Sequence, residues 1–537
     1  MFGTLTYKHS HFFNLSLIFA AGFKVKSLIR KRIVTKIGHM KINTRLNIFL
    51  RVVILVTISA IFIPESVCAG NWTTQVNVSL RGAAGTSDYL PFWARTGEEG
   101  ILPVTSSGLL RAGAKVGFMS KGWFFEAEGD FAGSLSARKP YSPQLASACI
   151  NRLYVSGGWK MIRLDVGMAP RRNELGELSL TGGDMMWTGN ARNMPGVNLW
   201  SDWIYFEKGH WFGIRANYAH YQMIDNRYVK NTMIHNKSIA LKAAFGRNVD
   251  FIFGFDHWAQ WGGESPAYGK QPSTFKDYMR IVLGKSGGSD ATTSDQINVL
   301  GNHLGRSFLR LVWRTEPFTI TYQYDKPFED GSGMRVQNYP DGVRSVSIAL
   351  KNRKAIVTDI MYEFANTTWQ SGVVHDRPAT EEEMAGQDPS DPFYGRFVIG
   401  GCDDYFNNGE YRSGWTYYGR TIGLPLFIPN TPDSEGITHG VISNRLVAHH
   451  IGLKGNVYFP YLFKCTFSRN YGRYHQGDSS PFASYPWQFS LALEVSLDRL
   501  LGKLPLNMSV GLYGDFGEVY KDSFGATLKF GFGKVFN

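Results

Sequence analysis

Cysteine is scarce in this sequence, and the common catalytic and metal-binding motifs are missing. The 537 residues include four cysteines, none close to another, at positions 68, 149, 402 and 465. Removing a leader that contains Cys68 would leave three, an odd number, which argues against a disulfide framework and against structural zinc. The sequence contains no HExxH, GxSxG, P-loop or CxxC motif. We therefore expect a protein that is not an enzyme and that holds no metal or other cofactor.

Long apolar runs and excess charge are also lacking in the body of the chain. No run of 18 apolar residues follows residue 70, which excludes a membrane-spanning helix there. The formal net charge is +13, but residues 1–69 carry ten Lys or Arg and one Glu, a contribution of +9 that leaves +4 for the rest. So small an excess gives no electrostatic basis for binding nucleic acid, and we expect no such partner.

Residues 1–69 have the pattern of an N-terminal extension and signal peptide. Two arginines precede an apolar stretch at 52–63, and small residues lead to an exit at Ala69. This order is typical of a secretory signal that is cut after the small residues. We expect Met40 to be the true start and residues 70–537 to form the mature domain.

Alternation of apolar and polar residues is what the body of the chain has in quantity. In "FTITYQYD" (318–325) the rings and Ile fall on one face of a strand, and Thr, Gln and Asp fall on the other. "QFSLALEVSLD", "GWFFEAEGDF" and the terminal "SFGATLKFGFGKVFN" repeat this pattern. Segments of about ten residues with a period of two are the signature of a transmembrane β-barrel. The apolar face would then contact lipid.

The spacing of these segments predicts an all-β fold, an up-and-down antiparallel transmembrane barrel of about 18 strands. Short turns alternate with long loops, among them 169–196, 262–305 and 367–445, and this puts both termini on the turn side, the periplasm. A secreted soluble all-β protein is the alternative, but it would show a polar outer face on most strands. The predicted strands are 75–85, 108–118, 122–134, 150–157, 160–168, 197–206, 211–221, 237–245, 249–261, 306–313, 317–325, 343–350, 355–366, 446–457, 461–470, 487–498, 506–516 and 524–536.

Two stretches in the long loops carry the candidate binding residues. The first loop stretch is "LSLTGGDMMWTGNARNMPGV" (178–197), and the second loop stretch is "DDYFNNGEYRSGWTYYGRTIGLPL" (403–426). Aromatic rings suit the C–H faces of sugars, and Asn, Asp and Arg suit hydroxyl and acidic groups. The other interpretation, slightly favoured on chemistry alone, is that these loops fold into the barrel as a plug, in which Tyr and Arg form hydrogen bonds within the protein. Both roles can coexist. The candidate polysaccharide-binding residues are Trp187, Asn190, Arg192, Asp404, Tyr405, Asn407, Tyr411, Arg412, Trp415, Tyr417 and Arg420.

The barrel pattern and these two stretches together resemble the capsule assembly Wzi family of Gram-negative outer membranes. The resemblance covers residues 75–537, with one small departure at the end of the chain, where Asn537 follows the terminal aromatic Phe536. It implies an eighteen-stranded surface lectin that holds exported capsular polysaccharide at the cell surface. Enterobacterial relatives also carry a periplasmic helical bundle, and this sequence shows no long amphipathic helix to form one.

The function expected from the resemblance is therefore capsule assembly by a non-enzymatic lectin. Its partners would be capsular polysaccharide, outer-membrane lipid and the polysaccharide export machinery, and the barrel would act as a monomer in the outer membrane after signal-peptide cleavage. The long loops would partly plug the lumen and grip the glycan by many weak contacts. The alternative is a porin or substrate-specific channel, which would need a water-filled path through the loops.

Overall fold

A computed structural model describes residues 72–136, 146–207, 209–374, 376–390, 394–398, 400–474 and 484–536. The predicted signal peptide, its cleavage site and the start at Met40 lie outside these residues. The chain divides into two units, 1–55 and 56–537, and the described residues all belong to the second. Within them, no helix has both the length and the apolar character needed to cross a membrane.

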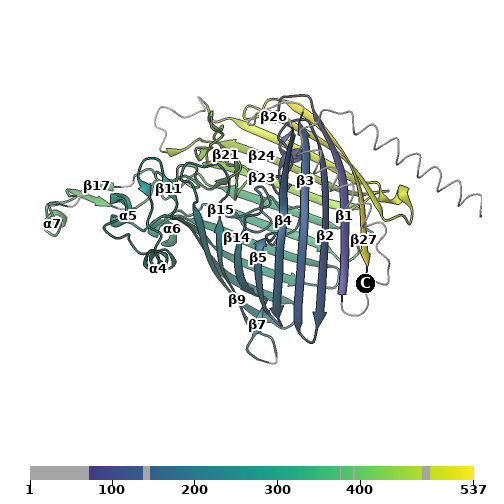
Figure 1. Cartoon of the computed structure of the whole chain (residues 1–537), viewed down its shortest axis with the longest axis horizontal. Coiled ribbons are helices and arrows are strands. Elements are labelled where there is room, and N and C mark those ends of the chain that lie inside the picture. Colours follow the sequence, from purple (N-terminus) through teal and green to yellow (C-terminus); the bar gives the residue numbers. More distant parts are fainter. Residues whose placement is uncertain are drawn as a thin grey trace, which may run out of the picture. The chain divides into compact units, whose positions relative to one another are not determined.

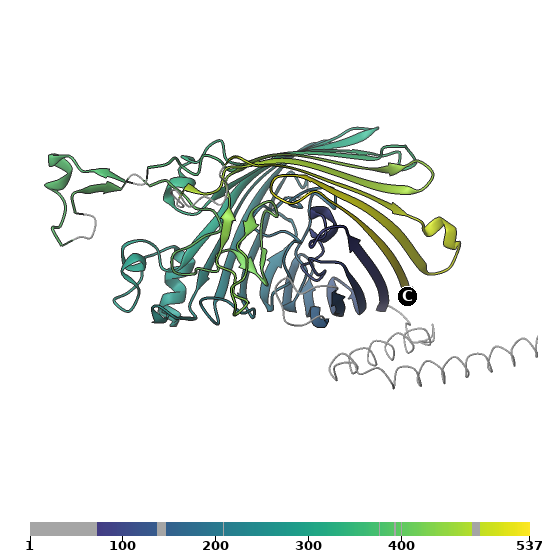
Figure 2. The ribbon, with the colours of Figure 1, turned by 90° about the horizontal axis from the view of Figure 1, so that it is seen from above.

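Eighteen antiparallel strands form a closed barrel, as predicted. Each strand pairs with the next along the wall, and β1 pairs with β27 from Thr74 opposite Phe536 to Gly85 opposite Gly525. Figure 2 shows this closure, with the last strand lying beside the first. The wall strands are β1 (Trp72–Gly85), β2 (Ser107–Ser120), β3 (Trp123–Ser136), β4 (Ala146–Trp159), β5 (Ile162–Met168), β6 (Gly196–Ser201) with its continuation β7 (Ile204–Tyr205), β8 (Phe212–Gln222), β9 (Met233–Phe245), β10 (Val249–Trp261), β13 (Asn302–Arg314), β14 (Phe318–Phe328), β15 (Gly342–Leu350), β16 (Asp359–Asn366), β23 (Leu446–Asn456), β24 (Pro460–Asn470), β25 (Trp487–Ser496), β26 (Leu506–Gly517) and β27 (Ser523–Phe536).

The strand boundaries differ from the predicted ones by a few residues. The predicted strand 355–366 begins only at Asp359, so the turn before it covers 351–358 instead of the predicted 351–354. The predicted strand 197–206 is interrupted at residues 202–203, and its two pieces, β6 and β7, both pair with β8. A local break of this kind leaves no trace in the alternation of side chains, and it therefore escapes sequence analysis.

The alternation sorts side chains between the two faces of the wall. On β27, Phe524, Leu528 and Phe530 are exposed on the outside, whereas Thr527 is buried on the inside. On β14 the inward Gln323 is buried as well. A wall whose outer face is apolar and whose inner face is polar is stable only if lipid surrounds it.

A belt of outward-facing rings marks the end of the wall that carries the short turns. Trp72, Trp123, Trp159, Trp313 and Phe245 are all exposed there, at or near the turn-side ends of their strands. Trp123 and Trp159 are cross-strand neighbours with ring centroids 6.4 Å apart. Amphipathic aromatic rings collect at the membrane–water interface. The belt therefore places the periplasmic interface at this end of the barrel, where the C-terminus also lies (Figure 1).

The long loops at the other end contain the remaining elements. Figures 1 and 2 both show β17, β18 and α7 projecting away from the barrel as an arm, whereas other loop segments lie within the curve of the wall. These elements are α3 (Phe92–Arg95), β11 (Glu264–Ser265), β12 (Gly269–Lys270), α4 (Phe275–Leu283), α5 (Thr293–Ile297), α6 (Gly331–Met334), β17 (Asp376–Pro378), α7 (Glu381–Met384), β18 (Arg396–Val398), β19 (Thr416–Tyr417), β20 (Arg420–Thr421), β21 (Ile428–Pro429) and β22 (Val441–Ser443), while η3 (Asp498–Leu501) lies in a turn at the periplasmic end.

The outward face of β27 gives a direct test of lipid contact. Leu528→Arg places a charge near the middle of the bilayer and should lower the free energy of unfolding by about 2–4 kcal/mol. Lys529→Gln alters the inner face one residue away and should change it by less than about 1 kcal/mol. Urea unfolding of the barrel in phospholipid vesicles measures both values. Equal effects of the two substitutions would contradict the assignment of the faces.

Candidate functional site

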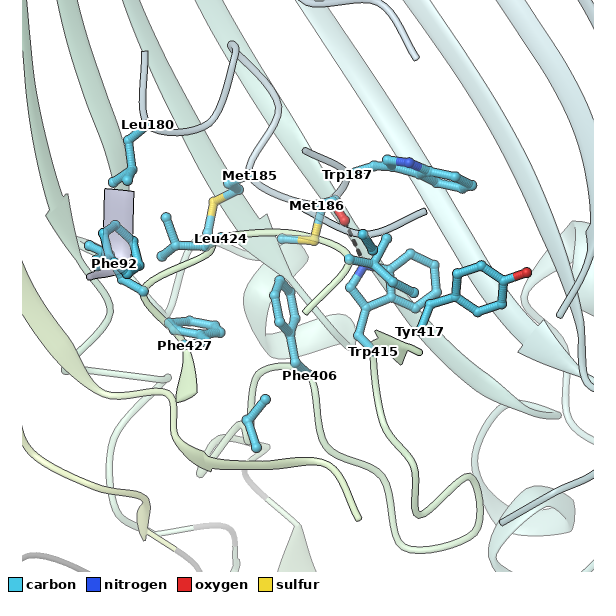
Figure 3. Close-up of a cluster of buried hydrophobic side chains, with 14 of the residues drawn as sticks. Phe92, Leu180, Met185, Met186, Trp187, Phe406, Trp415, Tyr417, Leu424 and Phe427 are labelled. Carbon is cyan, nitrogen blue, oxygen red and sulfur yellow. Dashed lines mark hydrogen bonds between the residues drawn. The ribbon is translucent and has the colours of Figure 1, made fainter. Parts of the chain in front are cut away.

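A hydrophobic core fills the loop-side part of the lumen. Loops 86–106 and 169–195 and the part 405–441 of loop 367–445 fold inward and pack their apolar side chains together (Figure 3). Wall residues on many sides join this core, among them Ala83 of β1 and Val343 of β15. The main loop residues in it are Phe92, Trp93, Leu180, Met185, Met186, Trp187, Tyr405, Phe406, Trp415, Tyr417, Ile422, Leu424 and Phe427. We call this assembly the plug.

An arginine on the wall holds the first loop stretch in place. Arg306 of β13 forms ion pairs with Asp256 of β10 (2.6 Å) and Asp325 of β14 (2.9 Å). It also pairs with Asp184 of the loop (3.3 Å) and donates a hydrogen bond to the carbonyl oxygen of Gly183 (2.5 Å). All four side chains are largely buried. Breaking such a buried network leaves charges without partners, which is strongly destabilising.

The beginning of the same stretch is bonded to β16 and β23, three and four strands further along the wall from β13. Glu363 of β16 accepts hydrogen bonds from the Ser179 hydroxyl (2.7 Å) and from the backbone N–H of Leu180. His450 of β23 is bonded through Nε2 to the carbonyl oxygen of Leu178 (2.8 Å). His450 thus faces the lumen, and the adjacent His449 is exposed on the outer face, as the alternation of side chains predicts.

The two loop stretches pack directly against each other. The indole N–H of Trp415 donates to the carbonyl oxygen of Met186, the dashed line in Figure 3. The side-chain amide of Asn190 donates to the backbone oxygen of Thr421 (3.0 Å) and to its hydroxyl (2.9 Å). Residues more than 200 positions apart in the sequence therefore form one unit.

Loop 86–106 is a third component of the plug that sequence analysis did not identify. The indole N–H of Trp93 donates to the Thr466 hydroxyl of β24 (3.1 Å), which fastens α3 to the wall. Arg420 of the second loop stretch donates to the carbonyl oxygen of Leu102 (2.7 Å). The signal that could have revealed this loop is "PFWAR", an aromatic pair directly after proline between two predicted strands.

Most of the predicted polysaccharide-binding residues lie inside this plug. Trp415, for example, is 0 % exposed. The hydroxyl of Tyr405 donates to Asp341 (3.0 Å), and the Arg473 guanidinium donates to Asp404 (2.9 Å). Trp187, Asn190, Tyr405, Tyr411, Trp415 and Tyr417 are buried, Arg192, Asp404, Asn407 and Arg420 are half-buried, and Arg412 is exposed. The contacts of these residues are those of a plug. Sugar binding by them stays a prediction. In this arrangement a glycan would reach only the exposed and half-buried residues.

A cavity of about 440 Å³ in the lumen is lined by paired charges. Glu99 of loop 86–106 forms ion pairs with Arg152 (2.5 Å) and Arg111 (3.1 Å). Burial alone would raise the pKa of Glu99, but the two guanidinium groups outweigh it and hold the pKa below its ordinary value. The Lys464 ammonium lies 4.5 Å from the centre of the Trp93 ring and so faces the underside of the plug.

A second, open cavity of about 630 Å³ lies at the loop end of the barrel, between loop 86–106 and the β26–β27 connection. Its aromatic lining is Tyr89, whose side chain is 41 % exposed, and Tyr520, over whose ring the Arg95 guanidinium sits at 5.1 Å. Asp88 and Lys521 are exposed at its edge. Ring faces combined with charged groups of both signs are what binding of a sugar or a sugar acid requires. We call this the outer cavity.

Acidic residues and cysteines elsewhere in the loops and wall are the other candidates for a metal site. The "EEE" run at 381–383 lies exposed on α7, and Glu383 forms an ion pair with Arg377 (2.8 Å). Cys149, Cys402 and Cys465, the cysteines of the described residues, are not joined by disulfides. In the described part of the chain, no three His, Cys, Asp or Glu side chains are grouped so that they could hold a metal ion.

Comparisons with known proteins identify the fold. No protein-family model and no curated protein matches the sequence. The structure is similar to that of Wzi, described as an outer-membrane protein involved in group 1 capsule assembly in Escherichia coli and as a carbohydrate-binding β-barrel. The TM-score is 0.50 and the identity 14 %, over 84 % of this chain and 83 % of that one.

Weaker likenesses extend to Pseudomonas aeruginosa OpdK with vanillate and to Acinetobacter baumannii OccAB4. For OpdK the TM-score is 0.44 and the identity 8 %, over 87 % of this chain and 99 % of that one. For OccAB4 the values are 0.41 and 10 %, over 86 % and 98 %. At such identities the likeness to Wzi shows the fold alone. The chain has the fold of an outer-membrane β-barrel.

The buried indole of Trp415 allows the stability of the plug to be tested. Trp415→Ala removes a large side chain from a packed core and should cost about 3–5 kcal/mol of plug stability. Protease cleavage within residues 403–427 of the detergent-solubilised barrel should therefore become faster, while the β-sheet circular dichroism signal stays unchanged. Arg412→Ala, an exposed change three residues away, is the control. Equal cleavage of the two variants would contradict a packed plug.

The environment of Glu410 predicts that the stability of the outer loops depends on pH. Burial and the nearby Asp295 raise the pKa of Glu410 to about 7 from its ordinary 4.5. The folded state therefore favours the neutral acid. The stabilisation that this provides is complete below about pH 4.5, and it is lost as the pH rises to about 7 and Glu410 ionises beside Asp295.

Protease sensitivity of loop 262–301 at pH 5 and pH 8 measures this effect. Glu410 accepts a hydrogen bond from Thr292 (3.2 Å) in that loop, so the loop should be cleaved faster at pH 8. Glu410→Gln cannot ionise and should make the two rates similar. If the wild-type rates corrected for protease activity are equal, Glu410 does not titrate in this range.

Proposed function

We propose that this protein binds polysaccharide at the outer surface of the outer membrane, without catalysis, and that the glycan is capsular polysaccharide whose assembly at the cell surface it assists. The observation that carries the proposal is the plug. Buried side chains from three loops meet in the lumen, and loops 86–106 and 169–195 are bonded to strands β13, β16 and β24 of the wall. A hydrophilic solute would have to cross this apolar core, and polar groups enter such cores only at a high free-energy cost.

A closed barrel of this kind is better suited to presenting a surface than to transporting a solute. The outer cavity supplies aromatic rings, hydroxyls and charges of both signs on the extracellular side. A polymer with a repeating unit can occupy many copies of such a site at once, so weak individual contacts give strong retention. The fold-level likeness to Wzi, a carbohydrate-binding barrel, supports the same proposal by analogy.

A substrate-specific channel is the second candidate, and one observation favours it. The charge-lined lumenal cavity of about 440 Å³ resembles the constriction of a pore more than a packed core. In that case the plug would be a gate. Planar-bilayer recordings discriminate between the two: we expect no steady conductance from the purified barrel, and large steady steps would favour the channel.

The outer cavity can be tested by substitution at its exposed edge. Tyr89→Ala combined with Lys521→Ala removes a stacking ring and a cation, and should weaken binding of purified capsular polysaccharide about tenfold, since each contact contributes about 0.5–1.5 kcal/mol. Surface plasmon resonance on the immobilised detergent-solubilised barrel measures this change. The amount of barrel in the membrane should not change.

Tyr458→Ala, at an exposed position in a periplasmic turn, is the matched control. It should bind glycan as the wild type does. If the outer-cavity variant and the control bind equally, the glycan site lies elsewhere on the loops. If the wild type binds no glycan at all, or shortens it, the proposed function itself is wrong.

A further inference from the structure

The helix α4 is a well-defined amphipathic helix in loop 262–301. Its N-terminus has a capping box, in which the Asp277 N–H donates to the Thr274 hydroxyl (3.3 Å) and the Thr274 N–H donates to the Asp277 carboxylate (3.0 Å). Its C-terminus ends at Gly284, which has a left-handed φ of 60°. Both ends are thus determined by local sequence, and the helix keeps a fixed register along its nine residues.

One face of α4 is docked on the outside of the barrel wall. The Tyr278 hydroxyl is hydrogen-bonded to that of Tyr218 on β8 (2.7 Å), and Ile281 is fully buried against Trp261 of β10. The Lys237 ammonium of β9 donates to the carbonyl oxygen of Val282. These wall residues point outward, because Tyr218 and Lys237 are paired in register and lie on the same face as the exposed Ile239.

The opposite face of α4 is apolar and uncovered. Phe275, Met279 and Leu283 follow one another at intervals of four residues, which places them in one stripe. Their side chains are 79 %, 38 % and 58 % exposed, and Phe275 is the most exposed large hydrophobic residue of the described chain. Exposed apolar stripes of this kind mark a contact surface.

The stripe continues the lipid-facing surface of the barrel. Ile239 and Leu241, the next outward residues of β9 below the Lys237 contact, are exposed and apolar, as are Phe251 and Phe253 on β10. Two residues along a strand span roughly 7 Å. The helix therefore lies at the upper edge of the apolar band, the depth at which amphipathic helices settle into a bilayer.

We propose that α4 is an interfacial helix whose Phe275–Met279–Leu283 stripe inserts into the outer leaflet of the outer membrane. Lipid is the occupant because the stripe is continuous with the lipid-facing band and lies on the outside of the wall. Lys276 and Lys285, both exposed at the ends of the helix, are placed to face phosphate groups of the lipid headgroups. This proposal does not depend on glycan binding.

Fluorescence quenching by brominated acyl chains tests the insertion. The background variant has Cys149, Cys402 and Cys465 replaced by Ser. In it, Met279→Cys introduces a single thiol that is labelled with the fluorophore NBD. The labelled barrel is then folded into phosphatidylcholine vesicles whose acyl chains either carry bromine at carbons 6 and 7 or carry none. We expect at least a twofold loss of emission with bromine. The control is NBD at Val373→Cys, an exposed apolar position in loop 367–445, where we expect less than about 10 % loss.

A second variant separates insertion from general collapse onto the membrane. Phe275→Glu with Leu283→Glu should abolish quenching at position 279, whereas Val373→Glu with Val374→Glu should leave it unchanged. Both variants should retain the β-sheet circular dichroism signal of the folded barrel. The proposal is overturned if bromine quenches neither position, or both equally. It is also overturned if bromine does not quench NBD at position 279 and the NBD emission changes with the number of barrels per vesicle. In that case a second copy of the protein would cover the stripe.

Discussion

Closure of the wall by β1 and β27 is the constraint on which the rest of this molecule depends. Inside a bilayer every backbone N–H and C=O needs a partner within the protein, and a sheet with an open edge would leave a row of them without one. Twelve residue pairs between the first and last strands remove that edge. Once the sheet is closed, side chains can only point to lipid or to the lumen. The period of two in the sequence follows from this division.

The strands could be predicted because their signal is local. Alternation within "FTITYQYD" or the terminal segment needs only neighbouring residues, and loop lengths between such segments give the topology. The plug also had a local signal, since the second loop stretch is rich in aromatic residues and the first combines glycines with Met185, Met186 and Trp187. Which of their residues would be buried was not predictable, because the partner of Trp415 lies 229 positions away at Met186. The docking of α4 on the outside of the wall depends likewise on Tyr218 of a distant strand.

The loops contribute residues to two features with different physical roles, the plug and the outer cavity. Buried aromatic residues such as Trp187 and Trp415 pack in the core of the plug, and charged wall residues such as Arg306 are bonded to its loops. Exposed residues such as Tyr89 and Lys521 lie at the outer surface. Aromatic and polar residues in the same loops therefore have different roles according to their depth. A sequence pattern of interleaved Tyr, Arg and Asn does not separate these roles by itself.

The arm formed by β17, α7 and β18 stands apart from this arrangement (Figure 1). Its ion pairs are internal, Arg377 with Glu383 and Arg396 with Asp376, and no residue of α7 is buried. The contacts that hold the arm together are therefore its own, and they are separate from those that hold the plug. Substitutions on the exposed face of α7 can change the outer surface of the loop without altering the packing of Trp415 or Phe427.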